Sequence, residues 1–463
     1  MLTYFPKFFS NKAILCYIIT LAIVSFAFMS RVMPFQFMMF GLVEVFLFFY
    51  CGSNLTRNWR KYSPRNFTKK LYFLALVVRI IYVVFMYFYY IEMTGRPNMY
   101  YPADEFMYEY YGELMASDGF NEFWRQIKNI GLSDRGYPIW MGFVYGAFGP
   151  HVLSDRIAKC FLDAFGCVLL YKLGKRNFGE FTGRMAGIFY LFIPNAWYYC
   201  ALSLKEAVMG FLVVLFVERG DFVIHSRKIE IKDLLVPALV ILLAFTFRTA
   251  LGAVLFAALV TAIVLSSKKQ LEGWKKVLYG LVFASWMMMT VGVEIIEETE
   301  ELWAGRTENQ SVGYEWRSET NSFAQYASAA VFAPMIFTIP FSSMVYVAGQ
   351  ENQMLLNGAN FIKNIMSGFV IFALFSLLLS GEWRKHVLPL AVTGGYLVVL
   401  VFSNFAHSER FHFPVMALEL MFAAYGISLV KNKQKKWYNL WVIFICLVNI
   451  AWAYVKLAGR GLA

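Results

Sequence analysis

The chain has 463 residues, of which 59% are hydrophobic, 19% aromatic and only 16% charged. This composition excludes a water-soluble protein of two or three domains and indicates a chain that is solvated mostly by lipid. The net charge of +12 comes from 42 lysines and arginines against 30 acids. Most of these bases lie in short clusters between apolar runs, so they indicate cytoplasmic loops of a membrane protein, and we expect no nucleic-acid partner.

Six cysteines lie in or beside the apolar runs, and no two of them are spaced as Cys-x-x-Cys. We therefore expect neither a disulfide framework nor a cysteine zinc site. The cysteines are Cys16, Cys51, Cys160, Cys167, Cys200 and Cys446.

Apolar runs bounded by charge predict the membrane-spanning helices. A hydrocarbon core about 30 Å thick needs about 20 apolar residues for each helical crossing, and about thirteen runs approach that length. We therefore predict an all-α polytopic membrane protein that forms a single transmembrane domain over 1–463. The runs are 13–29, 34–51, 71–92, 152–171, 181–199, 203–224, 234–247, 249–267, 277–293, 361–380, 387–404, 411–430 and 438–455.

Two of these runs have unusual features. Residues 13–29 resemble a secretory signal peptide, but no small-x-small cleavage site follows before Arg31, so we expect a retained anchor. Residues 152–171 fit least well, because Asp155, Arg156, Lys159 and Asp163 lie in the first half of the run.

Basic clusters set the expected orientation through the positive-inside rule. With these clusters in the cytoplasm, the N-terminus also lies inside and the C-terminus outside. The clusters are 57–70, Lys172/Lys175/Arg176/Arg184, Arg227/Lys228/Lys232, Lys268/Lys269/Lys275/Lys276, Arg384/Lys385 and Lys431/Lys433/Lys435/Lys436.

Two long segments then fall on the outer side, a first outer loop at 93–137 and a second at 294–360. Acidic residues outnumber basic ones in 93–135 and in 294–319. The stretch 326–350 is apolar, but a crossing there breaks the alternation of the spans. We expect it to be re-entrant or to lie in the outer interface.

An acidic pair, Asp104 and Glu105, follows the third apolar run by about a dozen residues, which holds it close to the outer lipid surface. A carboxylate in that position can act as general base toward an acceptor hydroxyl. The alternative is that Asp104, which follows Pro102, only caps the helix that comes next.

Charged residues also lie at the outer mouths of later apolar runs. Lys205 and Glu206 are functional candidates, because charges at this depth are costly; the alternative is that they pair with neighbouring helices to fix packing. Arg248 lies at the level of a lipid phosphate, which a guanidinium binds well, although an interfacial anchor explains it equally. Arg79 lies deeper and is expected to pair with a buried acid.

The stretch from His407 to His412, which includes Glu409, brings two histidines and a glutamate close together in sequence. Their spacing differs from that of the zinc proteases, so the metal content stays unknown and a divalent cation is only a candidate cofactor. Arg135-Gly136-Tyr137-Pro138 opens a short apolar segment that composition alone assigns to an interfacial turn and helix.

The order of these motifs resembles the GT-C membrane glycosyltransferases, and within them bacterial polyprenyl-phosphate-sugar transferases similar to protein O-mannosyltransferases and lipid A aminoarabinose transferases. The resemblance is densest over 100–225, returns at 405–430, and is limited to hydropathy over 226–400. The motifs are Asp104-Glu105, Gly136-Tyr137-Pro138, Phe148-Gly149-Pro150, Pro194-Asn195-Ala196-Trp197-Tyr198, Ser203-Leu204-Lys205-Glu206 and Glu409-Arg410-Phe411-His412-Phe413-Pro414.

The resemblance implies a GT-C-like fold with interfacial helices on the outer face, in the bacterial inner membrane. Asp104, with Glu105 beside it, takes the place of the catalytic carboxylate. Relatives usually have Arg-Tyr where this chain has Arg410-Phe411, so the tyrosine hydroxyl is missing here. The remaining substrate-binding candidates are Lys205, Glu206, Arg248, Arg410, Tyr137 and His407.

The implied reaction moves a sugar from a polyprenyl-phosphate donor to a glycan, lipid or protein acceptor on the outer face of the membrane. Our hypothesis is an inverting single displacement, with Asp104 as base and arginines as phosphate ligands. A polymerase or ligase of lipid-linked oligosaccharides would use the same residue types. A flippase or transporter would instead place broken helices and polar residues near the midplane, whereas the charges here concentrate at the outer mouth.

Overall fold

The computed structural model describes residues 2–128, 130–226, 231–266, 335–402 and 408–462. Within these ranges the regular structure is helical, apart from an isolated bridge between Val32 and Val345. The predicted all-α class is therefore confirmed for the described chain. The predicted run 277–293 and the candidate His407 lie outside the described residues.

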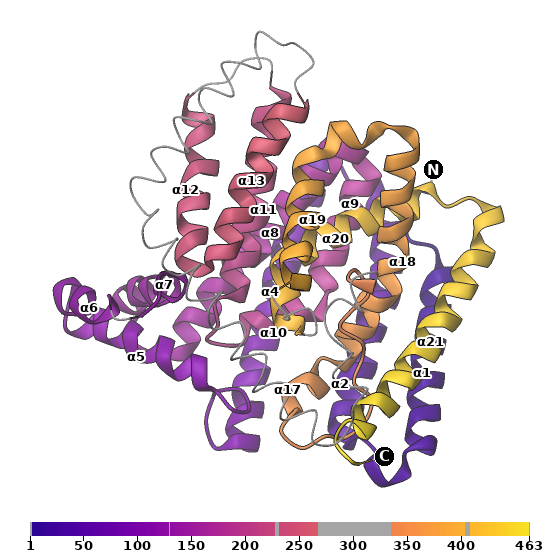
Figure 1. Ribbon diagram of the computed structural model, residues 1–463, viewed down its shortest axis with the longest axis horizontal. Coiled ribbons are helices and arrows are strands. Elements are labelled where there is room, and N and C mark those ends of the chain that lie inside the picture. The colour runs from indigo at the N-terminus through magenta and orange to yellow at the C-terminus, as the bar shows by residue number, and fades with distance from the viewer. Residues whose placement is uncertain (1, 129, 227–230, 267–334, 403–407, 463) are drawn as a thin grey trace.

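Seven helical segments of the described chain are long and apolar enough to cross a membrane. Two shorter apolar helices, α12 (Ile231–Phe247) and α13 (Thr249–Ser266), stand side by side (Figure 1). The seven segments are α1 (Lys7–Ala27), Phe35–Lys61 with α2 (Phe35–Phe46) and α3 (Gly52–Asn58), α4 (Pro64–Thr94), α18 (Asn357–Ser380), η5 (Glu382–His386) with α19 (Val387–Phe402), α20 (Glu409–Leu429), and η6 (Asn432–Gln434) with α21 (Lys435–Ala458).

The predicted number of about thirteen spans is not confirmed. The run 181–199 forms two short helices, α9 (Glu180–Phe192) and α10 (Pro194–Cys200), because Pro194 starts a new helix. The runs 152–171 and 203–224 form α8 (Val152–Phe178) and α11 (Glu206–His225), which carry buried charged side chains. These helices pack inside the bundle, so their charges meet protein groups and not lipid.

Helix α20 lies at the centre of the bundle. Nearly all of its apolar stretch is buried, whereas less than half of the apolar stretch is buried in α1, α4 and α21. Helix α20 packs against α8, α9, α11, α18 and α19. Helices α5 (Ala103–Ser117), α6 (Phe120–Ile127) and α7 (Leu132–Phe148) extend from one side of the bundle, and α12 packs on α7 (Figure 1).

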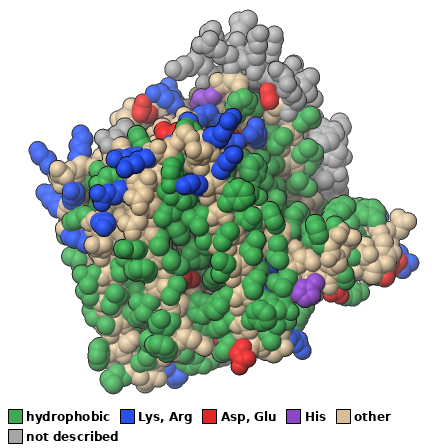
Figure 2. Space-filling view, turned by 180° about the vertical axis from the view of Figure 1, so that it is seen from behind, with side chains coloured by type: hydrophobic (Ala, Val, Ile, Leu, Met, Phe, Trp, Pro, Cys, Tyr) green, Lys and Arg blue, Asp and Glu red, His purple; other side chains and the backbone are tan. Residues whose placement is uncertain are grey.

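The basic clusters that lie within the described residues gather at one end of the bundle. Figure 2 shows the molecule from behind. Lysines and arginines are concentrated toward one end of this view, and hydrophobic side chains cover most of the rest. Arg184 Nη1 donates to the carbonyl of Trp59 at 2.7 Å, and His386 Nδ1 lies 2.6 Å from Asn177 Oδ1, so the loops that carry three of the clusters are joined. This common location is what the predicted cytoplasmic face requires.

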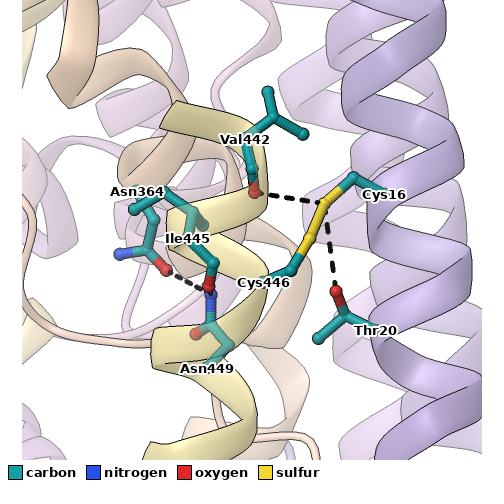
Figure 3. Close-up of a disulfide and its surroundings, with 7 residues drawn as sticks. All are labelled: Cys16, Thr20, Asn364, Val442, Ile445, Cys446 and Asn449. Atoms are coloured by element: carbon teal, nitrogen blue, oxygen red, sulfur yellow. Dashed lines mark hydrogen bonds between the residues drawn. A yellow bond between two sulfur atoms is a disulfide. The ribbon is translucent and has the colours of Figure 1, made fainter. Parts of the chain in front are cut away.

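The described part of the apolar stretch 326–350 forms no crossing helix. Residues 335–350 are irregular and largely buried, and their polar backbone groups bond to side chains of α18 and α21. Asn364 Nδ2 donates to the carbonyl of Pro340 at 2.9 Å, and Ser342 N donates to Asn449 Oδ1 at 2.8 Å. Figure 3 shows Asn364 and Asn449 facing each other. Non-helical backbone at this depth is tolerated because protein groups satisfy it.

One expectation about the cysteines is wrong. Cys16 of α1 and Cys446 of α21 form a disulfide (Figure 3). They lie 430 residues apart in the chain, and only the packing of the first helix against the last brings their Cα atoms to 6.8 Å. No spacing pattern in the sequence can reveal such a pair.

Arg79 has the buried acidic partner that the sequence predicted. Its Nε lies 2.5 Å from Asp163 Oδ2, and both side chains are fully buried. Tyr190 donates its hydroxyl to the other oxygen of Asp163 at 2.5 Å. The pair joins α4 to α8 in the interior of the bundle.

We expect the substitution Asp163→Leu to destabilise the fold by about 3–5 kcal/mol, because it leaves the Arg79 guanidinium buried without a counter-charge. The double variant Arg79→Met/Asp163→Leu should recover most of this loss, since neither charge is then buried. Reversible unfolding in mixed micelles measures both. A double variant as unstable as the single one would contradict this account of the pair.

Candidate active site

The N-terminal ends of three helices meet around one arginine. Asp104 lies in the first turn of α5, Glu206 begins α11, and Arg410 lies in the first turn of α20. Arg410 Nη1 bonds to Asp104 Oδ2, and its Nε bonds to Glu206 Oε1 at 2.5 Å. The positive end of a helix dipole disfavours a cation, so Arg410 depends on these two carboxylates.

Solvent exposure separates the two acids. The side chain of Glu206 is fully buried, that of Arg410 is 23% exposed and that of Asp104 is 44% exposed. Glu206 therefore holds Arg410 from the protein interior, and Asp104 is the carboxylate that a molecule from solution can reach.

Arg248, in the turn between α12 and α13, is held next to Arg410. Its Nη2 lies 3.4 Å from Glu206 Oε1, and its Nη1 donates to the Tyr396 hydroxyl at 2.8 Å. Its guanidinium lies 4.3 Å from the centre of the Phe411 ring, a cation–π distance. One buried carboxylate thus holds two guanidinium groups side by side.

Lys205 and Asp134 form a second ion pair beside this cluster. Lys205 Nζ lies 2.5 Å from Asp134 Oδ1, and the Tyr108 hydroxyl donates to the same oxygen at 2.8 Å. Burial raises the pKa of Asp134, but Lys205, Tyr108 and Arg410 together bring it below its ordinary value. Burial lowers the pKa of Lys205, and Asp134 opposes this shift. Asp134 is therefore ionised at neutral pH.

Glu105 is turned into the protein, although it follows Asp104 directly. Its side chain is fully buried and accepts hydrogen bonds from the backbone N–H groups of Ser203 at 2.6 Å and Met99 at 2.8 Å. Arg156 Nη2 lies 3.4 Å from its Oε1. These contacts tie the start of α5 to the loop before α11, so Glu105 fixes the position of its neighbour Asp104.

Tyr137 is also buried, beneath the cluster. Its hydroxyl donates to Asp155 Oδ2 at 2.7 Å and accepts from Lys159 Nζ at 2.7 Å. The charges that made 152–171 a poor span thus hold α7 against α8. Tyr137 has no exposed surface for a substrate.

The histidine-containing stretch is only partly described. Glu409 and His412 are buried, and His412 Nδ1 lies 2.6 Å from Lys363 Nζ. Among the described residues, no group of three or more histidine, cysteine or acidic side chains could hold a metal ion.

The structure brings Asp104, Glu206, Arg248 and Arg410 into direct contact and places Lys205 beside them. It also adds two residues that the sequence reasoning did not single out. Asp134 is adjacent to the Arg135-Gly136-Tyr137-Pro138 motif, which is a weak signal. Tyr396 lies in an ordinary apolar run, and only the packing of α19 against α13 places it near Arg248.

Comparison with known protein families gives a match in the last third of the chain. A model of the Alg9-like mannosyltransferase family matches residues 354–458, a region that includes α18 to α21 and Arg410. No curated protein matches the chain. The chain is a membrane glycosyltransferase of the GT-C type. This confirms the resemblance that the motifs predicted, although the match covers less than a quarter of the enzyme and overlaps only the later of the two regions where the motifs are densest.

We expect Glu206→Gln to lower the stability of the enzyme by about 1.5–3 kcal/mol, because two guanidinium groups lose the charged acceptor that they share. Glu113→Gln, at an exposed position of α5, is the matched control and should have no effect. Chemical unfolding in mixed micelles measures the difference. Equal stability of the two variants would show that the buried carboxylate does not hold the arginines.

Proposed function

We propose that the enzyme transfers a sugar from a polyprenyl-phosphate donor to a hydroxyl group of an acceptor, by a single displacement that inverts the sugar carbon. The name of the matched family makes mannose the first candidate for the sugar. The observation that carries the proposal is the contact of the exposed Asp104 carboxylate with Arg410, which shares Glu206 with Arg248.

The arginines fit the leaving group. When the bond between the sugar carbon and the phosphate oxygen breaks, the polyprenyl phosphate leaves with an additional negative charge. Arg410 and Arg248 can stabilise this charge by charge-assisted hydrogen bonds, and the N-termini of α5, α11 and α20 point the positive ends of their dipoles toward it. Lys205 is close enough to add a third cation.

Asp104 fits the general base. The acceptor oxygen attacks the sugar carbon on the side opposite to the phosphate, and its proton passes to the Asp104 carboxylate as the new C–O bond forms. Glu105 is fully buried and bonded, so we assign it the role of a positioning residue.

The same contact implies an order of events. Asp104 occupies a guanidinium nitrogen of Arg410 that the donor phosphate would need. Binding of the phosphate at Arg410 therefore displaces the carboxylate and frees it to accept a proton. The donor thus prepares the base, and acceptor activation follows donor binding.

We place the reaction on the membrane face opposite the basic clusters. The site residues begin α5, α11 and α20, whereas the described basic clusters lie at the other ends of the long helices. If the membrane is the bacterial inner membrane, as the motif resemblance implies, this face is the periplasmic one. The acceptor is a glycan or a glycan-bearing lipid or protein.

Asp104→Asn should reduce sugar transfer by about 100-fold to 10,000-fold, because the amide cannot take the proton. The same variant should bind polyprenyl phosphate several-fold more tightly than the wild type, because the carboxylate no longer competes for Arg410. Rates of product formation and equilibrium binding of polyprenyl phosphate test the two effects. Asp118→Asn, an exposed position at the end of the same helix, is the control. Wild-type rates, or weaker phosphate binding, would dismiss the assignment.

Arg410→Ala and Arg248→Ala should each raise the KM for the donor by about tenfold or more, since a charge-assisted hydrogen bond to phosphate is lost. Tyr396→Phe should have a smaller effect, because it only removes the hydroxyl that orients Arg248. Steady-state kinetics with polyprenyl-phosphate mannose gives these constants. Arg125→Ala on α6 serves as the exposed control. Unchanged donor KM in both arginine variants would argue against a phosphate site here.

A further inference from the structure

An open groove of about 410 Å³ lies at the segment that precedes α5, the helix that carries Asp104 in its first turn. Its walls come from the end of α4 and from the loop that leads into α5, including Arg96, Asn98 and Tyr101. The loop joins the helix directly, since Ala103 N donates to the carbonyl of Tyr101 at 3.1 Å. The proposed base therefore lies three residues beyond the aromatic wall of the groove.

The loop is held firmly from the protein side, so the groove has a fixed shape. The loop is hydrogen-bonded to α5, α8 and the short helix α17 (Glu351–Leu355). Four hydrogen bonds hold it: Met99 N to Glu105 Oε2 at 2.8 Å, Asn98 Nδ2 to Glu109 Oε1 at 2.9 Å, Arg156 Nη1 to the carbonyl of Pro97 at 2.6 Å, and Asn352 Nδ2 to the carbonyl of Tyr100 at 2.7 Å.

Tyr101 is unusual within this well-held loop. It is the one non-glycine residue of the described chain with a positive φ, at 56°, and its side chain is 68% exposed. A left-handed backbone costs a residue other than glycine about 1–2 kcal/mol. Packing does not explain this cost, because the ring makes little contact with the interior. Strain of this kind is typical of residues that contact a ligand.

The lining of the groove has the chemistry that a sugar needs. An exposed aromatic ring can stack against the apolar C–H face of a pyranose, and Thr94 and Arg96 add polar groups to a wall that also contains Met93, Met99 and Pro102. The donor phosphate has a better site at the paired arginines, Arg248 and Arg410.

We propose that this groove binds the sugar ring of the acceptor, with Tyr101 stacked on the ring, and so presents the acceptor hydroxyl to Asp104. This inference rests on the proposed function, because it assumes that Asp104 is the base. It assigns the donor and the acceptor to different residues: the arginine pair holds the phosphate, and the loop before α5 holds the acceptor.

The test uses the full-length enzyme in nanodiscs, polyprenyl-phosphate mannose as donor and a panel of octyl hexosides as acceptor probes. Tyr101→Ala and Tyr101→Gly should raise the acceptor KM about fivefold to tenfold, with the donor KM within about twofold of wild type. Tyr101→Phe should retain most of the acceptor affinity, because it keeps the ring. Tyr110→Ala, exposed on α5 outside the groove, should leave both constants unchanged. Saturation-transfer NMR of the same hexosides, without donor, gives a readout that is independent of catalysis.

Tyr101→Gly separates a ligand contact from a backbone effect, since glycine adopts the left-handed conformation freely but has no ring. A wild-type acceptor KM in Tyr101→Gly would overturn the inference, as would a change confined to the donor KM, which would mean that the groove holds the lipid. If the wild type releases polyprenyl phosphate but binds no hexoside, the assignment of the groove to the acceptor is wrong while the proposed function stands. No release of polyprenyl phosphate at all would overturn the proposed function and the inference with it.

Discussion

The arrangement of the site depends on one buried carboxylate. Glu206 accepts from both Arg248 and Arg410, and its full burial makes the attraction strong while leaving the outer edges of the guanidinium groups toward solvent. Without this anion, two cations at adjacent helix ends would repel each other, and each would also oppose a helix dipole. The acid thus makes it possible for two guanidinium groups to lie together where these helix ends meet.

A second set of buried charges holds the helices that carry the site. Helix α8 contributes Asp155, Arg156, Lys159 and Asp163, all fully buried. Each contacts another element: Asp163 contacts α4, Arg156 contacts α5, and both Asp155 and Lys159 contact Tyr137 of α7. Because these partners lie on three different helices, the buried charges of α8 join it to α4, α5 and α7. The four charged residues that made 152–171 a poor lipid-facing span therefore join α8 to its neighbouring helices inside the bundle.

The structure differs from the expectations wherever the answer depends on tertiary packing, which local sequence patterns do not record. Hydropathy counts apolar residues but does not tell lipid from protein. The runs 181–199 and 203–224 were therefore each predicted to be a span, whereas in the structure they form α9 with α10, and α11, which are largely buried in the bundle. Adjacent residues in a helix point in different directions, so the pair Asp104 and Glu105 has one exposed and one buried member. The Cys16–Cys446 bond had no local pattern at all.

The sequence by itself determined the helical class, the clustering of basic residues between apolar runs, and several of the residues that meet in the candidate site. These follow from local properties: runs of apolar residues, clusters of charge and short motifs. The tertiary structure alone decided which of these residues touch. Asp104 and Arg410 are 306 residues apart, Glu206 and Arg410 are 204 apart, and Arg248 and Tyr396 are 148 apart. Such contacts depend on how helix ends pack together in space, and the energy of that packing is spread over the whole bundle.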